Sequence, residues 1–142
     1  MKLRALFVRI WPLVLIVLIG LVLWANKAPD TARVTQVSCA TLATGCTAHV
    51  DGREIQFGMI GETKPLAPFQ IWVKTAGLRN AEARFTMEGM DMGFNLYTLR
   101  VDQQGVFRAN VTLPVCVTGR REWSMILDID KTRLAVPFVT DL

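Results

Sequence analysis

The chain has few of the residues from which most catalytic sites are built. Its 142 residues include one histidine, one tyrosine and three cysteines. It contains no nucleophile elbow, P-loop or G-x-G-x-x-G motif, and its acidic residues are scattered. Because no base stands beside a nucleophile in any of the known spacings, we expect that the protein is not an enzyme.

Charge is absent from a long segment near the start of the chain. Residues 10–26 form a run of 17 without a charged side chain, with Trp11 and Trp24 near its ends. Such a run is at the lower limit for crossing a bilayer core about 30 Å thick, and tryptophan favours the membrane interface. The run is longer than the core of a usual signal peptide, and no good small-residue cleavage site follows it. An uncleaved anchor is therefore favoured over a cleaved signal.

The charges that flank this run predict its orientation. Three basic residues precede it, whereas the two that follow it are diluted by Asp30. Because the more positive flank stays in the cytoplasm, we expect a single-pass protein of the cell inner membrane with a periplasmic C-terminal domain. The predicted segments are a cytoplasmic tail (1–9), a transmembrane anchor (10–26), a linker (27–33) and an exported domain (34–142).

The basic net charge of +4 follows largely from this topology. From Lys27 onward the chain has 13 basic and 12 acidic residues. No cluster of lysine and arginine is accompanied by stacking aromatic residues. A nucleic-acid partner is therefore not expected.

Apolar and polar residues alternate with period two through most of the exported domain, and no long period of 3.6 residues follows Asn26. Turn-forming residues separate the runs. About seven short strands in roughly 110 residues suit an all-β immunoglobulin-like sandwich, and Pro137 indicates an edge or terminal strand. The predicted strands are 54–59, 69–75, 83–87, 96–101, 106–113, 122–129 and 133–139.

Three cysteines in an exported domain indicate one disulfide and one remaining thiol. Cys39 and Cys46 enclose a short loop and form the simplest pair, and Cys46 with Cys116 is the main alternative. Cys46 and His49 also have a C-x-x-H spacing. Because two further zinc ligands are not evident, we interpret His49 as structural.

The segment FTMEGMDMGFN, residues 85–95, places three methionines within six residues. Met87 continues the inward face of its strand and should be buried, whereas Met90 and Met92 should be more exposed. A structural interpretation makes them the cover of one end of the sandwich. A functional interpretation makes Met90 and Met92 a soft site, completed by Met87 or by a residue of a neighbouring loop such as Cys116 or Met59. Thioether and thiolate ligands of this kind select Cu(I).

Three segments, FTMEGMDMGFNLYTL, GVFRANVTLPVC and EWSMILDID, resemble the YtkA-like and FixH-like group of small membrane-anchored proteins. That resemblance implies an exported immunoglobulin-like domain and an association with copper supply or respiratory oxidase assembly. The chain departs from the pattern through its cysteines and through the lack of histidine beside the methionines. The matching positions are Met87, Met90, Met92, Gly93, Gly105, Phe107, Ala109, Val111, Leu113 and Trp123.

Two functions follow from these observations. The first is a membrane-anchored periplasmic accessory protein that handles copper, or helps to assemble a respiratory oxidase, through the methionine-rich turn. The second is a metal-free interaction module or accessory subunit that docks on a membrane complex. Retention of Cu(I) by the purified protein distinguishes the two.

Overall fold

The computed structural model describes residues 2–25, 33–87, 90, 95–116 and 118–141, and within the N-terminal helix the side chains of residues 11–22. The chain divides into two compact units, residues 1–31 and 32–142. The first unit holds one helix, α1 (Lys2–Ala25), which contains Pro12. Among the described residues, no helix is long and apolar enough to span a membrane.

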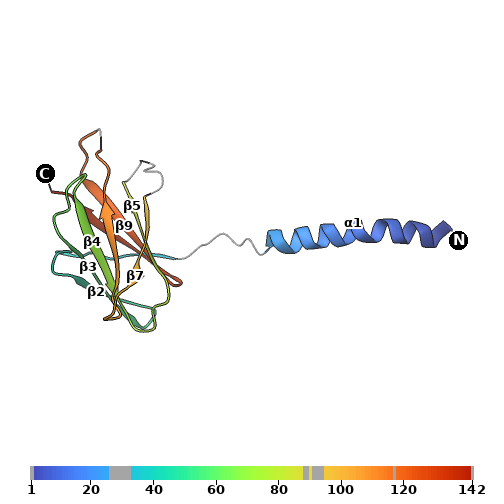
Figure 1. Ribbon diagram of the computed structural model, residues 1–142, viewed down its shortest axis with the longest axis horizontal. Coiled ribbons are helices and arrows are strands. Elements are labelled where there is room, and N and C mark those ends of the chain that lie inside the picture. Colours follow the sequence, from blue (N-terminus) through green and yellow to red (C-terminus); the bar gives the residue numbers. More distant parts are fainter. Residues whose placement is uncertain (1, 26–32, 88–89, 91–94, 117, 142) are drawn as a thin grey trace. The chain divides into compact units, whose positions relative to one another are not determined.

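The second unit is a β-sandwich of two five-stranded sheets (Figure 1). Sheet 1 has the order β1–β10–β9–β5–β6, and sheet 2 has the order β2–β3–β4–β8–β7. Paired strands are antiparallel except β1 and β10, which run parallel. The strands are β1 (Val34–Gln36), β2 (Cys46–Val50), β3 (Arg53–Ile60), β4 (Pro68–Lys74), β5 (Ala81–Thr86), β6 (Leu96–Thr98), β7 (Arg100–Val101), β8 (Phe107–Thr112), β9 (Glu122–Ile129) and β10 (Thr132–Val139).

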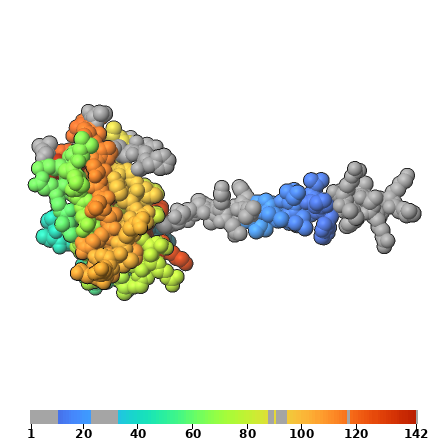
Figure 2. Space-filling model, in the orientation of Figure 1, coloured from blue at the N-terminus to red at the C-terminus, as the bar shows by residue number. Residues whose placement is uncertain are grey.

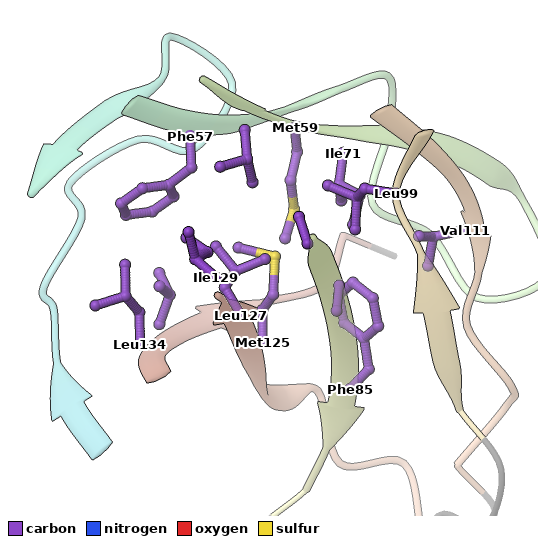
Figure 3. Close-up of a cluster of buried hydrophobic side chains, with 14 of the residues drawn as sticks. Phe57, Met59, Ile71, Phe85, Leu99, Val111, Met125, Leu127, Ile129 and Leu134 are labelled. Carbon is purple, nitrogen blue, oxygen red and sulfur yellow. The ribbon is translucent and has the colours of Figure 1, made fainter. Parts of the chain in front are cut away.

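The core lies between the two sheets because alternate side chains of each strand point inward. Figure 3 shows side chains of β3, β4, β5, β9 and β10 pointing into this shared interior. The inward residues of these strands are buried, and Phe138 packs against them with partial exposure. The buried ones are Ile55, Phe57, Met59, Phe69, Ile71, Val73, Ala83, Phe85, Trp123, Met125, Leu127, Ile129, Leu134 and Val136.

The predicted strand at 96–101 is wrong as a single strand. β6 pairs with β5 in sheet 1, whereas β7 pairs with β8 in sheet 2, so the chain changes sheets at Leu99. Leu99 is buried, but Val101, which would share its face in a continuous strand, is 59% exposed. Alternation did not reveal the crossing, because the residues before and after Leu99 continue the same polar and apolar order while pairing with different strands.

Among the described residues the sandwich has ten strands, whereas seven were expected. Besides the division of 96–101, β1 and β2 were not predicted. β1 has no buried residue, and β2 buries only Ala48 among its five residues. Both lie at sheet edges, where little apolar surface is covered and alternation is therefore weak. Pro137 lies in the last strand, beyond the residues of β10 that pair with β1, as its missing N–H requires.

Asp130 holds the turn between β9 and β10. Its backbone is left-handed, with a φ of 53°. Its carboxylate accepts hydrogen bonds from the backbone N–H groups of Arg79 and Asn80, both at 3.1 Å, and from the Arg53 guanidinium at 3.2 Å. The bond from Asn80 is the largest cause that lowers the pKa of Asp130, followed by those from Arg79 and Arg53. The turn is thereby tied to the segment before β5 and to β3 in the other sheet.

Asp130→Asn should lower the free energy of unfolding at pH 7 by about 1–2 kcal/mol, because hydrogen bonds to a charged acceptor are stronger than those to an amide. Asparagine also tolerates left-handed backbone, so the turn itself is kept. The carboxylate has a lowered pKa in the folded state. Its contribution to the free energy of unfolding is therefore present above the pKa that the carboxyl has in the unfolded state. This contribution is lost as the pH falls through the lower pKa of the folded state.

Urea unfolding between pH 7 and pH 2 would measure this dependence. The difference in the free energy of unfolding between Asp130→Asn and the natural chain should become smaller in acid. Asp51→Asn, at the left-handed aspartate of the β2–β3 turn (φ 51°), is the matched control and should change little. If the loss of stability in Asp130→Asn stays constant across the pH range, the ionised carboxylate does not stabilise the turn as described.

Candidate sulfur site at one end of the sandwich

The methionine-rich turn begins where β5 ends. Met87 is 3% exposed and belongs to the core, which confirms the expectation that it continues the inward face of Phe85. The backbone N–H of Met90 donates to the carbonyl oxygen of Met87 at 3.2 Å, so the chain folds back on the buried residue. Met90 is half-buried and packs against the core. Burial of Met87 therefore sets where Met90 lies.

Cys116 approaches Met90 from the opposite sheet. It follows β8 of sheet 2, whereas Met90 follows β5 of sheet 1. The Cys116 thiol donates to the Met90 Sδ at 3.9 Å, and its Sγ lies 3.0 Å from the Thr118 hydroxyl oxygen. Cys116 is half-buried and is not part of a disulfide. One thiol and one thioether therefore converge at the end of the sandwich.

The spacing of these two sulfur atoms suits one shared ion. With metal–sulfur bonds of about 2.3 Å, taken from zinc thiolates, atoms 3.9 Å apart subtend an angle of about 116° at the metal. That angle is close to the trigonal value and leaves room for further ligands. Because both donors are soft, the pair favours Cu(I) over hard cations such as Mg²⁺ or Ca²⁺.

The surroundings of Cys116 favour its thiolate form. The side-chain hydrogen bond from Thr118 is the largest cause that lowers the pKa of Cys116, and the Thr118 backbone N–H adds to it. Arg120 contributes a further backbone hydrogen bond and a positive charge, while partial desolvation acts in the opposite direction. Since the thiolate is the metal ligand, these contacts favour binding of a cation at neutral pH.

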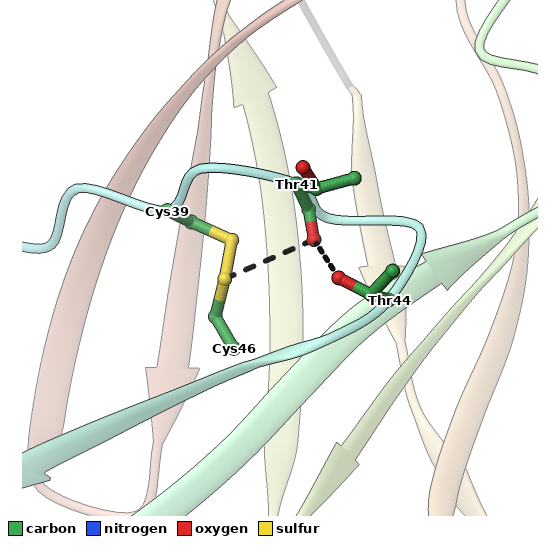
Figure 4. Close-up of a disulfide and its surroundings, with 4 residues drawn as sticks. All are labelled: Cys39, Thr41, Thr44 and Cys46. Carbon is green, nitrogen blue, oxygen red and sulfur yellow. Dashed lines mark hydrogen bonds between the residues drawn. A yellow bond between two sulfur atoms is a disulfide. The ribbon is translucent and has the colours of Figure 1, made fainter.

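The disulfide joins Cys39 to Cys46, the local pair (Figure 4). Cys116 therefore remains a thiol. Their Cα atoms are 5.9 Å apart, within the usual range for a disulfide. Inside the loop, the Thr41 carbonyl oxygen accepts the Thr44 hydroxyl at 3.0 Å. Gly45 follows in a left-handed conformation, with a φ of 85°. A Cβ there would lie 2.7 Å from the Trp72 ring, so glycine is required where the loop passes this ring.

The structure brings together two of the four residues expected to bind metal. Met90 and Cys116 are in contact, Met87 turns into the core, and Met92 lies outside the described residues. In the described part of the chain, no group of three or more histidine, cysteine, aspartate or glutamate side chains is placed to hold a metal. Sequence reasoning did not identify Thr118, although its hydroxyl, two residues after Cys116, is a signal that could have been read.

The chain has no match among protein-family models, curated proteins or solved structures. Function is therefore inferred from the geometry of this site and from the residues of the sequence.

Met87→Ala and Met90→Ala should affect stability differently, because only the first opens a cavity in the core. We expect Met87→Ala to lower the free energy of unfolding by about 2–4 kcal/mol. Met90→Ala should lower it by no more than about 1 kcal/mol, because its side chain is only half-buried. Thermal and urea unfolding of the metal-free protein would measure both. Equal losses for the two variants would show that Met90 is a core residue and would weaken the metal hypothesis.

Proposed function

We propose that this protein is a membrane-anchored, exported accessory protein that holds Cu(I) at the Cys116–Met90 pair. The observation that supports this function best is the 3.9 Å approach of the thiol to the thioether. Two strands from different sheets must end at the same place for this contact to exist, so it is not a consequence of local sequence.

In the proposed site, the Cys116 thiol loses its proton to solvent and its sulfur becomes an anionic ligand. Thr118 then stabilises the thiolate by donating its hydroxyl hydrogen. Met90 supplies a neutral thioether, which binds Cu(I) at any pH because it does not titrate in the range where proteins are folded. Met92 is the proposed further ligand from the same turn.

We propose an immunoglobulin-like topology for the exported domain. In this comparison β3, β4, β8 and β7 correspond to strands A, B, E and D of such a fold, and β6, β5, β9 and β10 correspond to C′, C, F and G. The connections β4–β5, β6–β7 and β8–β9 pass from one sheet to the other, as the corresponding connections do in that fold. β1 and β2 are additions at the edges.

The membrane anchor is proposed from residues 10–26, which carry no charge, and from the basic residues before them. The proposed location is the cell inner membrane, with residues 1–9 in the cytoplasm and residues 34–142 in the periplasm. A disulfide between Cys39 and Cys46 suits an oxidising compartment. The proposed client is a respiratory oxidase or another membrane complex that receives copper, as the resemblance to YtkA-like and FixH-like proteins implies.

Copper retention tests the proposed site. The purified protein, loaded with Cu(I) in ascorbate and dialysed against a weak chelator, should keep copper. Ascorbate is chosen because it keeps copper reduced without opening the disulfide. Cys116→Ser and Met90→Ala should each lower retention by about tenfold or more, because each removes one of the two described soft ligands.

His49→Ala is the control for the copper experiment. It removes the chain's one histidine, which is exposed on β2 and could bind copper adventitiously. Retention should be unchanged in this variant. If the natural chain keeps no copper, the metal-free interaction module becomes the preferred function.

A reporter fusion tests the proposed topology. A phosphatase that is active only outside the cytoplasm, fused after Leu142, should be active in a bacterial host. Replacing Lys2, Arg4 and Arg9 by glutamine should reduce this activity several-fold, because it removes the charge bias that orients the anchor. The mass of the mature chain should still include residues 10–26. Loss of that segment would convert the proposed anchor into a cleaved signal.

A further inference from the structure

The change of sheet at Leu99 leaves a gap beside β8. Arg100 pairs with Arg108, and the same register continued would pair Thr98 with Asn110. Thr98 pairs instead with β5 of sheet 1, so the paired part of β8 on this side ends at Arg108. A pocket of about 400 Å³ lies at this place and is lined by residues of β4, β6, β7 and β8.

The two charged side chains that line this pocket are both arginines. Arg100 and Arg108 are directly opposite each other on an antiparallel pair, so their side chains lie on the same face of sheet 2. Like charges at such positions destabilise a sheet. No acidic residue is among the described residues that line the pocket. Figure 2 shows the green surface of β4 beside the orange surface of β8, the two strands that form the floor of this face.

Only one of the two guanidinium groups has an acidic partner in the described part of the chain. Arg108 Nε donates to an Asp102 carboxylate oxygen at 2.8 Å. The backbone N–H groups of Gln104 and Val106 hold the same carboxylate at 2.8 and 2.9 Å. Arg100 is exposed and forms no ion pair with any described residue. Two positive side chains and one negative side chain give the site a formal charge of +1.

A chain of hydrogen bonds fixes the neutral side chains of the pocket. Arg108 Nη1 donates to Gln70 Oε1 at 3.1 Å, and Gln70 Nε2 donates to Asn110 Oδ1 at 3.3 Å. Both amide oxygens are therefore occupied as acceptors. Asn110 Nδ2, Arg108 Nη2 and the Arg100 guanidinium are left as donors without a partner among the described residues. A pocket whose remaining polar groups are donors is suited to an anion.

The backbone of Asn110 adds one more donor. The Thr112 N–H and carbonyl oxygen both bond to the Tyr97 hydroxyl, and the Val106 carbonyl oxygen accepts the Asp102 N–H at 2.8 Å. Alternate residues of a strand direct these groups to the same side. The N–H of Asn110 therefore points toward the gap, where β7 does not extend.

We propose that this pocket binds a carboxylate between Arg100 and Arg108, with Asn110 as the neutral donor. A guanidinium group presents parallel N–H bonds in one plane, which match the two oxygens of a carboxylate. One carboxylate balances the formal charge of the site, whereas a phosphate monoester carries about −1.5 to −2 at pH 7 and would exceed it. The pocket shares no residue with the Cys116–Met90 pair, so this inference is independent of the proposed function.

The test is an NMR titration of the isotope-labelled full chain in detergent at constant ionic strength. It follows the Nε–H signals of Arg100 and Arg108 and the amide signals of Asn110. The probes are the tripeptide N-acetyl-Val-Thr-Val with a free carboxyl end and the same tripeptide with an amidated end. The acid should shift these signals to saturation, because it supplies the carboxylate. An amide that binds as tightly as the acid would overturn the proposal.

Two further probes identify the source of the carboxylate and test its chemistry. N-acetylglycine represents a small-molecule acid. Affinity equal to that of the tripeptide acid would support a small carboxylate as the ligand, and tighter binding of the tripeptide would support the end of a peptide chain. Inorganic phosphate that displaces the tripeptide acid at a lower concentration than N-acetylglycine would overturn the choice of a carboxylate.

Arg100→Gln tests the role of the unpaired arginine. It should weaken binding of the tripeptide acid by about tenfold or more, because it removes a charge-assisted hydrogen bond. Its melting temperature should not fall, because the substitution also removes the repulsion between the two arginines. A lower melting temperature with unchanged binding would assign Arg100 a structural role and overturn the site.

Arg79→Gln is the matched control. It removes the same charge from an exposed arginine that does not line the pocket. Binding of the tripeptide acid should be unchanged, and a loss equal to that of Arg100→Gln would show a response to net charge alone and overturn the site. Copper retention by Arg100→Gln should equal that of the natural chain, which separates failure of this inference from failure of the proposed function.

Discussion

The packing of Phe85 between the two sheets is the contact on which most of this structure depends. Its ring makes edge-to-face contacts with Phe69 of sheet 2 and with Tyr97 and Phe138 of sheet 1, at centroid distances of 5.9–6.1 Å. Such pairs are worth about 0.5–1.5 kcal/mol beyond the burial of their area. One fully buried ring therefore joins β4, β5, β6 and β10 near the end that holds the sulfur atoms.

Tyr97 adds a polar connection to the same region. Its hydroxyl donates to the Thr112 carbonyl oxygen at 2.8 Å and accepts the Thr112 N–H at 3.3 Å, so the edge strand β6 of sheet 1 is bound to β8 of sheet 2. The end of β8 is thereby held against the strand that follows the methionine-rich turn. Cys116 and Met90 consequently approach each other from two anchored strand ends, an arrangement that suits a preformed binding site.

The disulfide and the thiol have separate roles because the pairing is local. Cys39 and Cys46 close a loop at the start of β2, and the chain-entropy argument assigns such a short loop a contribution of about 2–3 kcal/mol. Pairing of Cys46 with Cys116 would have removed the only thiol beside Met90. The nearby thioether and the Thr118 hydroxyl give this remaining thiol a defined environment.

The sequence alone determined the two-layer β architecture, the inward faces of most strands and the burial of Met87, because each of these depends on alternation within a few residues. It also identified Cys116 and Met90 by their chemistry, although without showing that they meet. Only the tertiary structure decided that contact and the change of sheet at Leu99. Each of these depends on which strands become neighbours, and strand pairing joins residues up to tens of positions apart that no local pattern relates.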